Sequence, residues 1–454
     1  MKHKIHFSPF SLPILFFGVA ILIGTLVLSS PASIVSGEIS TIDALFTATS
    51  AACVTGLTVV DTGSRFTRFG QTVILCLIQL GGLGIMTFTG LIFYLWRRQV
   101  SLTDRIAVGQ TLLHDPGFDL GRFLTRIVLW TLGIETAGAL LIYIQDPQGF
   151  GVYSAVFHSI SAFCNAGFSL YSDSLIRWKS HWSINLVFIA LIMLGGMGFS
   201  VLTETVGCIR QWVFLRRKNR PPVRLTWYPR IVISTSLFLV LAGWGCIYLA
   251  EFTGPGRNAP ATTALLTSLF QSVTCRTAGF NTLDTGQMTN VSLLVMIILM
   301  FIGGAPGSCA GGIKVTTFRA LTAFAAAQIK GRQQARIGRF AIDSSTINKA
   351  LVLLLFATII VFTATLGLNI TEAGLRPHPE AKGLYLEILF ETISALGTVG
   401  LSTGLTPQLS LAGKCIITVL MFLGRLGPIL FLAAIQSYQK EQFYRLPEES
   451  MLIG

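Results

Sequence analysis

The chain has 454 residues, of which 52% are hydrophobic and only 12% are charged, about half the share of charged residues in a typical soluble domain. This composition excludes a soluble enzyme, a disordered chain and a nucleic-acid-binding protein, and it predicts an integral membrane protein. We interpret the net charge of +13 as an excess of Lys and Arg in cytoplasmic loops.

The eight cysteines and six histidines are scattered, without a C-x-x-C pair or a metal-ligand spacing. We interpret the cysteines as reduced core thiols and expect no covalent cofactor. The first apolar run, at residues 9–28, is longer than the core of a signal peptide, so it predicts a transmembrane helix. Cleavage after the following Ser-Ser-Pro-Ala-Ser is the alternative.

Apolar runs long enough to cross about 30 Å of hydrocarbon recur along the chain. Eight are predicted to span the membrane, at residues 9–28, 72–96, 126–145, 184–208, 231–250, 291–320, 350–370 and 412–436. A shorter apolar segment lies between the two members of each successive pair, at 41–52, 152–164, 262–275 and 383–396. These segments are too short to span, so they predict four re-entrant pore helices, each followed by a loop.

Each short segment leads into a similar loop. The four loops are Cys53-Val54-Thr55-Gly56, Cys164-Asn165-Ala166-Gly167, Arg276-Thr277-Ala278-Gly279 and Gly397-Thr398-Val399-Gly400. Their last glycines are spaced 111, 112 and 121 residues apart. A second landmark recurs in step with the first, in Leu80-Gly-Gly-Leu-Gly84, Leu194-Gly-Gly-Met-Gly198, Ile302-Gly-Gly-Ala-Pro306 and Leu423-Gly-Arg-Leu-Gly427. Two landmarks recurring together indicate a tandem array.

The predicted fold is an all-α polytopic membrane protein with four helix–pore-helix–loop–helix repeats in a pseudo-fourfold arrangement around a central ion pore. The repeats are residues 1–98, 126–209, 231–320 and 350–436; the linkers are 99–125, 210–230 and 321–349, and the tail is 437–454. The linkers, the residues directly flanking them and the termini carry 22 of the 33 basic residues. This bias predicts that they are cytoplasmic and that the loops enter from outside.

Four non-helical loops at membrane depth must be buried in protein or line an aqueous path, because lipid cannot satisfy their backbone groups. Four loops around one axis could direct carbonyl groups at a dehydrated cation, with glycine supplying the unusual dihedrals. The C-terminal dipole ends of the short helices would also favour a cation. Close helix packing is the alternative for these glycines, and it is the stronger interpretation for the Gly-Gly pairs.

The sixth predicted span is interrupted by five glycines and one proline between Gly303 and Gly312. Gly and Pro disfavour a helix interior, so we predict that residues 303–312 unwind beneath the filter and form a gate. A tolerated kink is the alternative. The predicted gate residues are Gly303, Gly304, Pro306, Gly307, Ser308, Gly311, Gly312 and Arg425.

Arg425 lies in the middle of the eighth predicted span, where a charge is costly unless it faces a cavity or a partner. We predict that it hydrogen-bonds the unwound segment and opposes cation flow. An ion pair with Glu391 or Glu204 is the competing interpretation. Lys314 could reach the cytoplasmic face, and Arg276 and Glu391 are expected to brace the third and fourth loops.

Several of these segments together resemble the Trk/Ktr/HKT superfamily of cation transporters. The resemblance rests on Thr49-Ser-Ala-Ala-Cys-Val-Thr-Gly-Leu-Thr-Val-Val-Asp-Thr-Gly63, Thr274-Cys-Arg-Thr-Ala-Gly-Phe-Asn281, Gly311-Gly-Ile-Lys-Val-Thr-Thr317, Leu423-Gly-Arg-Leu-Gly-Pro428 and Tyr444-Arg-Leu-Pro-Glu-Glu449. The compact length is most similar to the membrane subunits (KtrB type) of bacterial Ktr potassium uptake systems.

This resemblance implies potassium uptake through a pore in each protomer of a homodimer in the bacterial inner membrane. It also implies a cytoplasmic ring of nucleotide-binding regulatory subunits (KtrA type), support by sodium, and an intramembrane gating loop. Family members with Ser at the first filter glycine tend to favour sodium, so Gly56 supports potassium. Asn165 and the shorter third loop predict an asymmetric filter with relaxed selectivity.

Three other functions are weighed against potassium transport. A sodium-selective carrier of the same superfamily is the main alternative. A membrane enzyme is disfavoured because the chain has no H-E-x-x-H, no G-x-S-x-G and no paired intramembrane Asp. A non-conducting scaffold or receptor is disfavoured because it would not need four non-helical loops at membrane depth, where such backbone is costly. Membrane lipid is an expected partner; nucleic acid is not.

Overall fold

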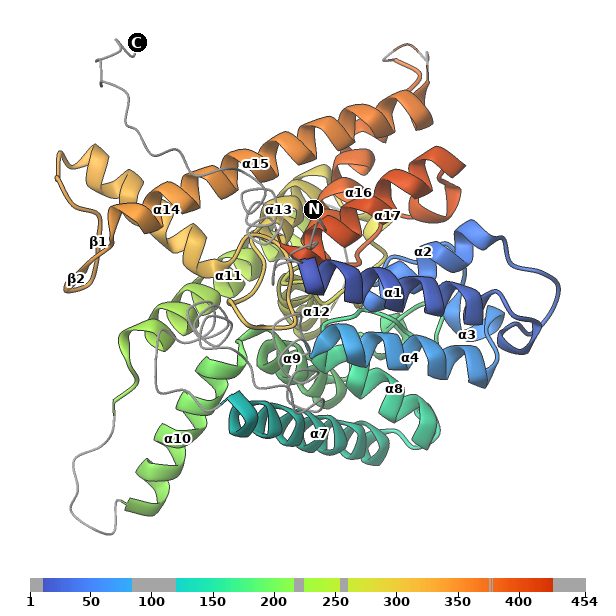
Figure 1. The fold of residues 1–454 in the computed structure, drawn as a ribbon, viewed down its shortest axis with the longest axis horizontal. Coiled ribbons are helices and arrows are strands. Elements are labelled where there is room, and N and C mark those ends of the chain that lie inside the picture. Colours follow the sequence, from blue (N-terminus) through green and yellow to red (C-terminus); the bar gives the residue numbers. More distant parts are fainter. Residues whose placement is uncertain are drawn as a thin grey trace, which may run out of the picture.

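The computed structural model describes residues 11–83, 120–215, 224–253, 260–374, 377 and 379–427. Helices dominate the fold, and many of them run side by side (Figure 1). The predictions for both termini, for residues 84–119 and for the end of the eighth span lie outside the described residues.

Ten of the described helices overlap the predicted apolar runs. They are α1 (Ser11–Leu28), α4 (Arg68–Gly82), α7 (Leu120–Gln145), α9 (Trp182–Gly196), α10 (Phe199–Leu215), α11 (Trp227–Phe252), α13 (Asn290–Phe301), α14 (Val315–Ile329), α15 (Ser344–Leu368) and α17 (Leu411–Leu426). Among the described residues, three helices are long and apolar enough to cross a membrane, or four if one bent pair is counted. The eight spans therefore stay a prediction.

Four short helices begin and end within one residue of the predicted re-entrant segments. They are α2 (Thr41–Ala52), α8 (Val152–Phe163), α12 (Ala261–Thr274) and α16 (Leu384–Gly397). Each buries one phenylalanine completely, at an equivalent position nine or ten residues before its loop glycine: Phe46, Phe157, Phe270 and Phe390. These rings anchor the short helices in the apolar core and so set the depth of the loops that follow.

Two carboxylates, one buried and one half-buried, tie the first long helix of a repeat to the second. We call the first, α11 or α15, the outer helix and the second, α13 or α17, the inner helix. Glu251, at the end of α11, accepts hydrogen bonds from the backbone N–H and the hydroxyl of Thr289 at 2.7 and 2.8 Å. Glu372, after α15, accepts equivalent bonds from Ser410 at 3.0 and 2.7 Å. Thr289 and Ser410 are the N-cap residues of α13 and α17, so each carboxylate fixes where an inner helix starts.

The fourth predicted span, 184–208, is bent, so whether it crosses the membrane as one broken helix stays a prediction. Helices α9 and α10 meet at 112° at residues 197–198. Gly198 has φ +83°, a dihedral that other residues adopt only at a cost. The bend lets the Phe199 N–H donate to the carbonyl of Gly307 at 3.3 Å. Tertiary contact with the broken sixth segment therefore overrides the local helical pattern.

The linker between the third and fourth repeats contains a two-stranded hairpin, a small addition to a fold that is otherwise helical in the described residues. Strands β1 (Arg336–Ile337) and β2 (Phe340–Ala341) pair antiparallel. Gly338 takes φ +63° in the two-residue turn, as tight hairpin turns require. Figure 1 shows this hairpin at the edge of the molecule, beside the start of α15.

Candidate functional site: four loops above a broken helix

The four loops share an unusual backbone. The residue two positions before each glycine has a positive φ: Val54 at 54°, Asn165 at 58°, Thr277 at 68° and Thr398 at 49°. The glycines themselves have φ values of +95°, +70°, +77° and +89° at Gly56, Gly167, Gly279 and Gly400. Non-glycine residues held in this region store strain, and such strain clusters at ligand sites.

The four glycines lie against one another in cyclic order. A Cβ built on Gly56 would come within 2.4 Å of the Ala166 carbonyl oxygen, and one on Gly167 within 2.9 Å of that of Ala278. The same construction on Gly279 meets the oxygen of Val399 at 2.6 Å, and on Gly400 that of Thr55 at 2.1 Å. No side chain fits at these four positions, so the loops approach as bare backbone.

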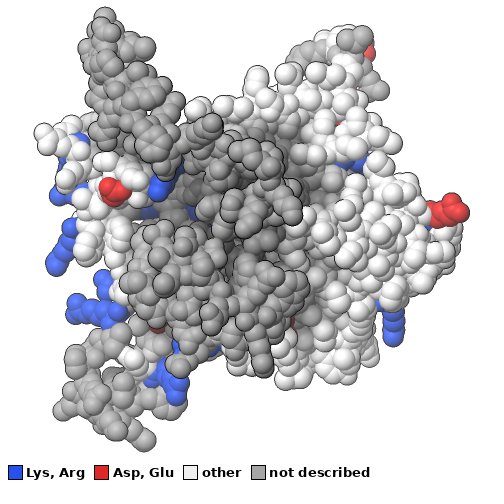
Figure 2. All heavy atoms as spheres, viewed as in Figure 1, with Lys and Arg blue, Asp and Glu red and all other residues white. Residues whose placement is uncertain are grey.

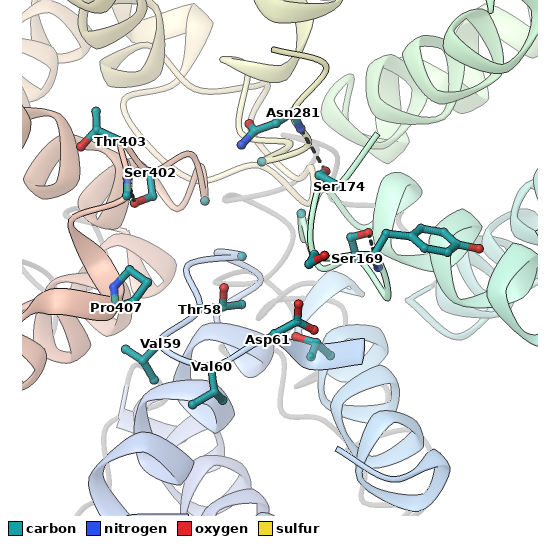
Figure 3. Close-up of a pocket in the computed structure, with 18 of the residues that line it drawn as sticks. Thr58, Val59, Val60, Asp61, Ser169, Ser174, Asn281, Ser402, Thr403 and Pro407 are labelled. Atoms are coloured by element: carbon teal, nitrogen blue, oxygen red, sulfur yellow. Dashed lines mark hydrogen bonds between the residues drawn. The ribbon is translucent and has the colours of Figure 1, made fainter. Parts of the chain in front are cut away.

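A pocket of about 420 Å³ opens on one side of these glycines, and all four loops line it. In Figure 3 the loops surround the pocket in chain order, from blue through green and yellow to red. Its polar lining includes Asp61, Ser169, Asn281, Ser402 and Thr403. The pocket therefore offers oxygen atoms next to the glycine ring.

The loops are fastened to their short helices in two ways. Ser50 and Ser394 accept hydrogen bonds from the loop glycines Gly56 and Gly400 at 3.1 and 3.2 Å. In the second and third loops the hydroxyls instead donate, from Ser161 to the carbonyl of Phe168 and from Thr274 to that of Phe280.

The third loop also has a tighter backbone turn. The N–H before its glycine bonds four residues back, from Ala278 to Thr274, where the equivalent bond in each other loop spans five residues. This is the shorter loop that the sequence indicates, and it makes the ring of loops asymmetric.

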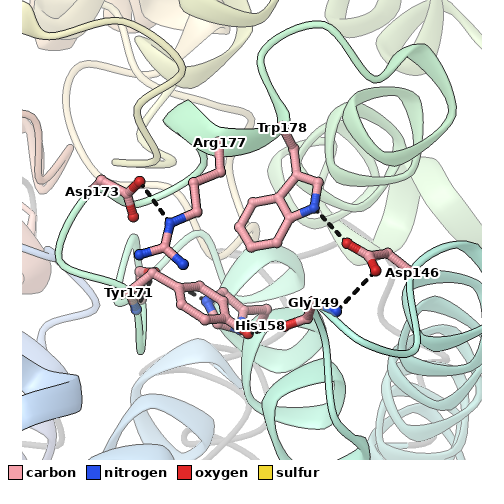
Figure 4. Close-up of polar contacts among 8 residues, drawn as sticks. Asp146, Gly149, His158, Tyr171, Asp173, Arg177 and Trp178 are labelled. Atoms are coloured by element: carbon pink, nitrogen blue, oxygen red, sulfur yellow. Dashed lines mark hydrogen bonds and ion pairs between the residues drawn. The ribbon is translucent and has the colours of Figure 1, made fainter.

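Aromatic and polar side chains support the second loop from outside (Figure 4). The ring of Tyr171, which lines the pocket, stacks on His158 with centroids 5.1 Å apart. Asp146 accepts hydrogen bonds of 2.8 Å from the Trp178 indole and from the Gly149 N–H. These two bonds, the one from Trp178 first, hold the pKa of the Asp146 carboxyl below its ordinary value.

Residues 302–314, between α13 and α14, are not helical. A Cβ on Gly311 would lie 2.2 Å from Oγ1 of Thr398, so the segment lies directly against the fourth loop. Gly307 and Gly312 have φ values of +71° and +64°. Ser308 donates to the carbonyl of Ala305 within the segment at 2.6 Å.

The other inner helices hold this segment at their glycine landmarks. The Cys309 thiol donates to the carbonyl of Gly82 at 2.8 Å, and the Cys309 N–H donates to that of Gly195 at 3.2 Å. Ala305 N–H donates to the carbonyl of Gly196 at 3.0 Å. Arg425 of α17 donates to the carbonyls of Cys309 and Gly81. Helices from the first, second and fourth repeats thus converge on one residue, Cys309.

The glycine landmarks also allow close packing against the short helices. A Cβ on Gly81, Gly195 or Gly424 would lie about 2 Å from the carbonyl oxygen of Ala52, Phe163 or Leu396, respectively. Such contact leaves no room for a side chain, as expected where small residues bring helices together in membranes.

The remaining charged residues have specific partners. Arg276 donates to the Gly303 carbonyl at 2.8 Å and so joins the third loop to the broken segment. Glu391 accepts from the Ser402 and Thr406 hydroxyls and the Thr403 N–H, beyond the fourth loop. Lys314 turns back to the carbonyl of Ala310. Within the described residues Arg425 forms no ion pair with Glu391 or Glu204, the competing interpretation above.

Two residues of this region were not predicted from the sequence to be functional. Cys309 was counted among the core thiols, although its place among the glycines of residues 303–312 could have drawn attention to it. Glu135, in the middle of α7, is 4% exposed and hydrogen-bonds Gln79 and Cys164 at the end of α8. A lone acidic residue in an apolar run is a signal that sequence reading could have used.

Glycine-lined loops against a broken intramembrane helix, in an almost wholly helical fold, define a membrane transporter for small ions. A family model described as "TrkH: Cation transport protein" matches residues 14–443. The chain belongs to this family of cation transporters and is not an enzyme.

Known relatives are similar over almost the whole chain. The Ktr system potassium uptake protein B of Bacillus subtilis is 38% identical, covering 99% of this chain and 98% of that protein. The potassium/sodium uptake protein NtpJ of Enterococcus hirae is 34% identical, covering 100% and 99%. The crystal structure of TrkH from Vibrio parahaemolyticus has the same fold, with a TM-score of 0.68 at 20% identity, covering 96% of this chain and 86% of that one.

Proposed function

We propose that this chain takes up potassium across the bacterial inner membrane through a filter made by the four loops. The ring of four bare-backbone glycines carries the proposal, because backbone carbonyls can replace the hydration shell of a cation. The short helices end at these loops, and their negative dipole ends favour a cation there. Each of the four proposed repeats contributes one loop, and transported K⁺ is the substrate.

The broken segment is the proposed gate. It is packed against the fourth loop, and Arg425 and Arg276 place two buried guanidinium groups on its carbonyls. A cation leaving the filter would meet this segment and its positive charges, so conduction requires the segment to move. Opening must break the bonds to Gly82, Gly195 and Arg425, and a regulatory event has to supply that free energy.

Regulation and assembly are proposed from the similarity to proteins of the Ktr system. Several relatives are named as Ktr system proteins. We propose that this chain works as a homodimer with a cytoplasmic nucleotide-binding ring of KtrA type. Sodium assistance is proposed on the same ground, since the Enterococcus relative is named for both ions. Both termini are proposed to be cytoplasmic.

Rubidium uptake into proteoliposomes tests the proposal, with sodium varied and Gly56→Ser compared. The substitution places a Cβ 2.4 Å from the Ala166 oxygen at φ +95°, so it must distort the filter and relax selectivity toward sodium. Gly133→Ser is the matched control, because a Cβ at Gly133 meets nothing within 4 Å.

The outcomes separate the candidate functions. The proposed filter is supported if potassium flux is saturable and its selectivity over sodium falls in Gly56→Ser but not in Gly133→Ser. Flux of sodium alone identifies a sodium carrier instead. Absence of flux both with and without the cytoplasmic ring contradicts the pore.

A further inference from the structure

The hairpin between α14 and α15 forms a compact basic surface. Its exposed residues include Lys330, Arg332, Arg336, Arg339 and Phe340, which we call the basic hairpin surface. Figure 2 shows Lys and Arg gathered on the side of the molecule where this hairpin lies, while the opposite side is mostly uncharged. None of these basic side chains forms an ion pair within the described part of the chain.

The surface is held in place by its own small core. Ala327, Ala335 and Ile347 are buried together, with Phe324 and Ile342 against them. The Ile342 N–H donates to the carbonyl of Ala335 at 2.8 Å, which closes the base of the hairpin. The basic residues are therefore displayed on a fixed support.

The position of the hairpin relative to the membrane–water interface follows from the helices that it contacts. The Trp227 ring packs on Phe340 with centroids 5.4 Å apart, and its indole N–H donates to the Ile337 carbonyl at 3.3 Å. Trp227 is the first residue of one candidate span, Trp227–Phe252, and the hairpin ends directly before another, Ser344–Ala373. Trp at the end of a span marks the membrane–water interface. The hairpin therefore lies at the depth of the lipid head groups.

The side chains of the basic hairpin surface favour anionic lipid as its binding partner. Four cationic side chains face outward beside an exposed Phe340, which is 57% exposed, and Ile329, which is 86% exposed. Asp343 and Glu204 are the acidic residues near this surface, and Glu204 is engaged by Thr226. Cationic residues interleaved with apolar ones at an interface are suited to anionic lipid.

We propose that the basic hairpin surface binds anionic phospholipid head groups of the cytoplasmic leaflet. The arginines and lysine contact the phosphates while Phe340 and Ile329 enter the acyl boundary. Because the hairpin connects α14, which follows the broken segment, to α15, bound lipid would fix the cytoplasmic end of that segment. The proposal does not depend on which cation the chain carries.

The test is a lipid titration of the purified full chain in detergent, followed by its melting temperature. Phosphatidylglycerol is compared with phosphatidylcholine at equal amounts. The test variant is Arg336→Gln/Arg339→Gln, and the matched control is Lys179→Gln/Lys382→Gln, which removes two exposed charges elsewhere. Arg336→Lys/Arg339→Lys keeps the charge and checks that any loss is electrostatic.

Phosphatidylglycerol is expected to stabilise the wild type, the control and the Lys variant, while phosphatidylcholine has little effect. In the Gln variant the amount needed for half the effect should rise roughly 30-fold, about fivefold for each charge lost. An equal response to the two lipids in the wild type overturns the proposal. So does a Gln variant with an unchanged phosphatidylglycerol response. If that variant also loses binding to the cytoplasmic ring, the surface is a protein-docking site instead.

Discussion

The guanidinium of Arg425, on α17 of the fourth repeat, bonds both the proposed gate and the first repeat. It is 8% exposed and donates to the carbonyls of Cys309 and Gly81. Arg425→Ala removes both bonds and the positive charge, so the broken segment loses one of its anchors. We expect basal rubidium flux to rise in proteoliposomes without the cytoplasmic ring.

Arg425→Lys is the control for this expectation. Lysine keeps the charge but cannot hold two carbonyls with a rigid fork, so flux should rise less than in Arg425→Ala. Flux and nucleotide response that both stay at the wild-type level in Arg425→Ala would contradict the gate.

Asp146 gives a prediction about acid stability. Its hydrogen bonds with Trp178 and Gly149 lower the pKa of the folded state relative to the unfolded chain. The carboxylate therefore stabilises the fold above the unfolded pKa of about 4, and this contribution is lost as the pH falls through the folded value. The melting temperature of Asp146→Asn should start lower at neutral pH and fall less below about pH 4. Parallel curves for the two proteins would exclude this role.

At the scale of elements, the short helices could be predicted from the sequence and the bend at Gly198 could not. Apolar length and a following glycine define α2, α8, α12 and α16 locally. The bend depends on the Phe199 N–H reaching Gly307, more than 100 residues away in the chain. The contacts of Cys309 with Gly82, Gly195 and Arg425 could not be predicted from the sequence either, because they join four segments that lie far apart in the chain.

The carboxylates that tie outer to inner helices should contribute to stability according to their burial. Glu251 is 1% exposed and holds the N-cap of α13, so Glu251→Ala removes two bonds from partly buried donors of Thr289 and should cost about 2–3 kcal/mol. Glu372 makes the same bonds to Ser410 at the surface, and Glu372→Ala should cost about 1 kcal/mol. Unfolding in a denaturing detergent measures both. Equal costs would show that burial does not set these contributions.

At the scale of the whole molecule, the ring of loops must be closed between the first and last repeats. Gly400 meets Thr55 across this boundary as closely as the other glycines meet their neighbours. The first and fourth repeats are not consecutive in the chain, so no linker joins them directly. Side-chain contacts between α2 and α17 must therefore hold these two repeats in register.

One ion pair lies at this closure. Lys414 at the start of α17 and Asp43 at the start of α2 approach to 2.7 Å, with side chains 18% and 19% exposed. Asp43→Asn or Lys414→Gln alone leaves an unpaired, partly buried charge, whereas the double variant leaves none. We expect a coupling energy of about 1 kcal/mol in a double-mutant cycle on stability, at the upper end for partly exposed pairs.

The same cycle should report on the filter. Because Asp43 lies in the first turn of the helix that leads to Gly56, each single variant should lower potassium selectivity and the double variant should recover part of it. A coupling energy near zero with unchanged selectivity would mean that helix packing alone closes the ring.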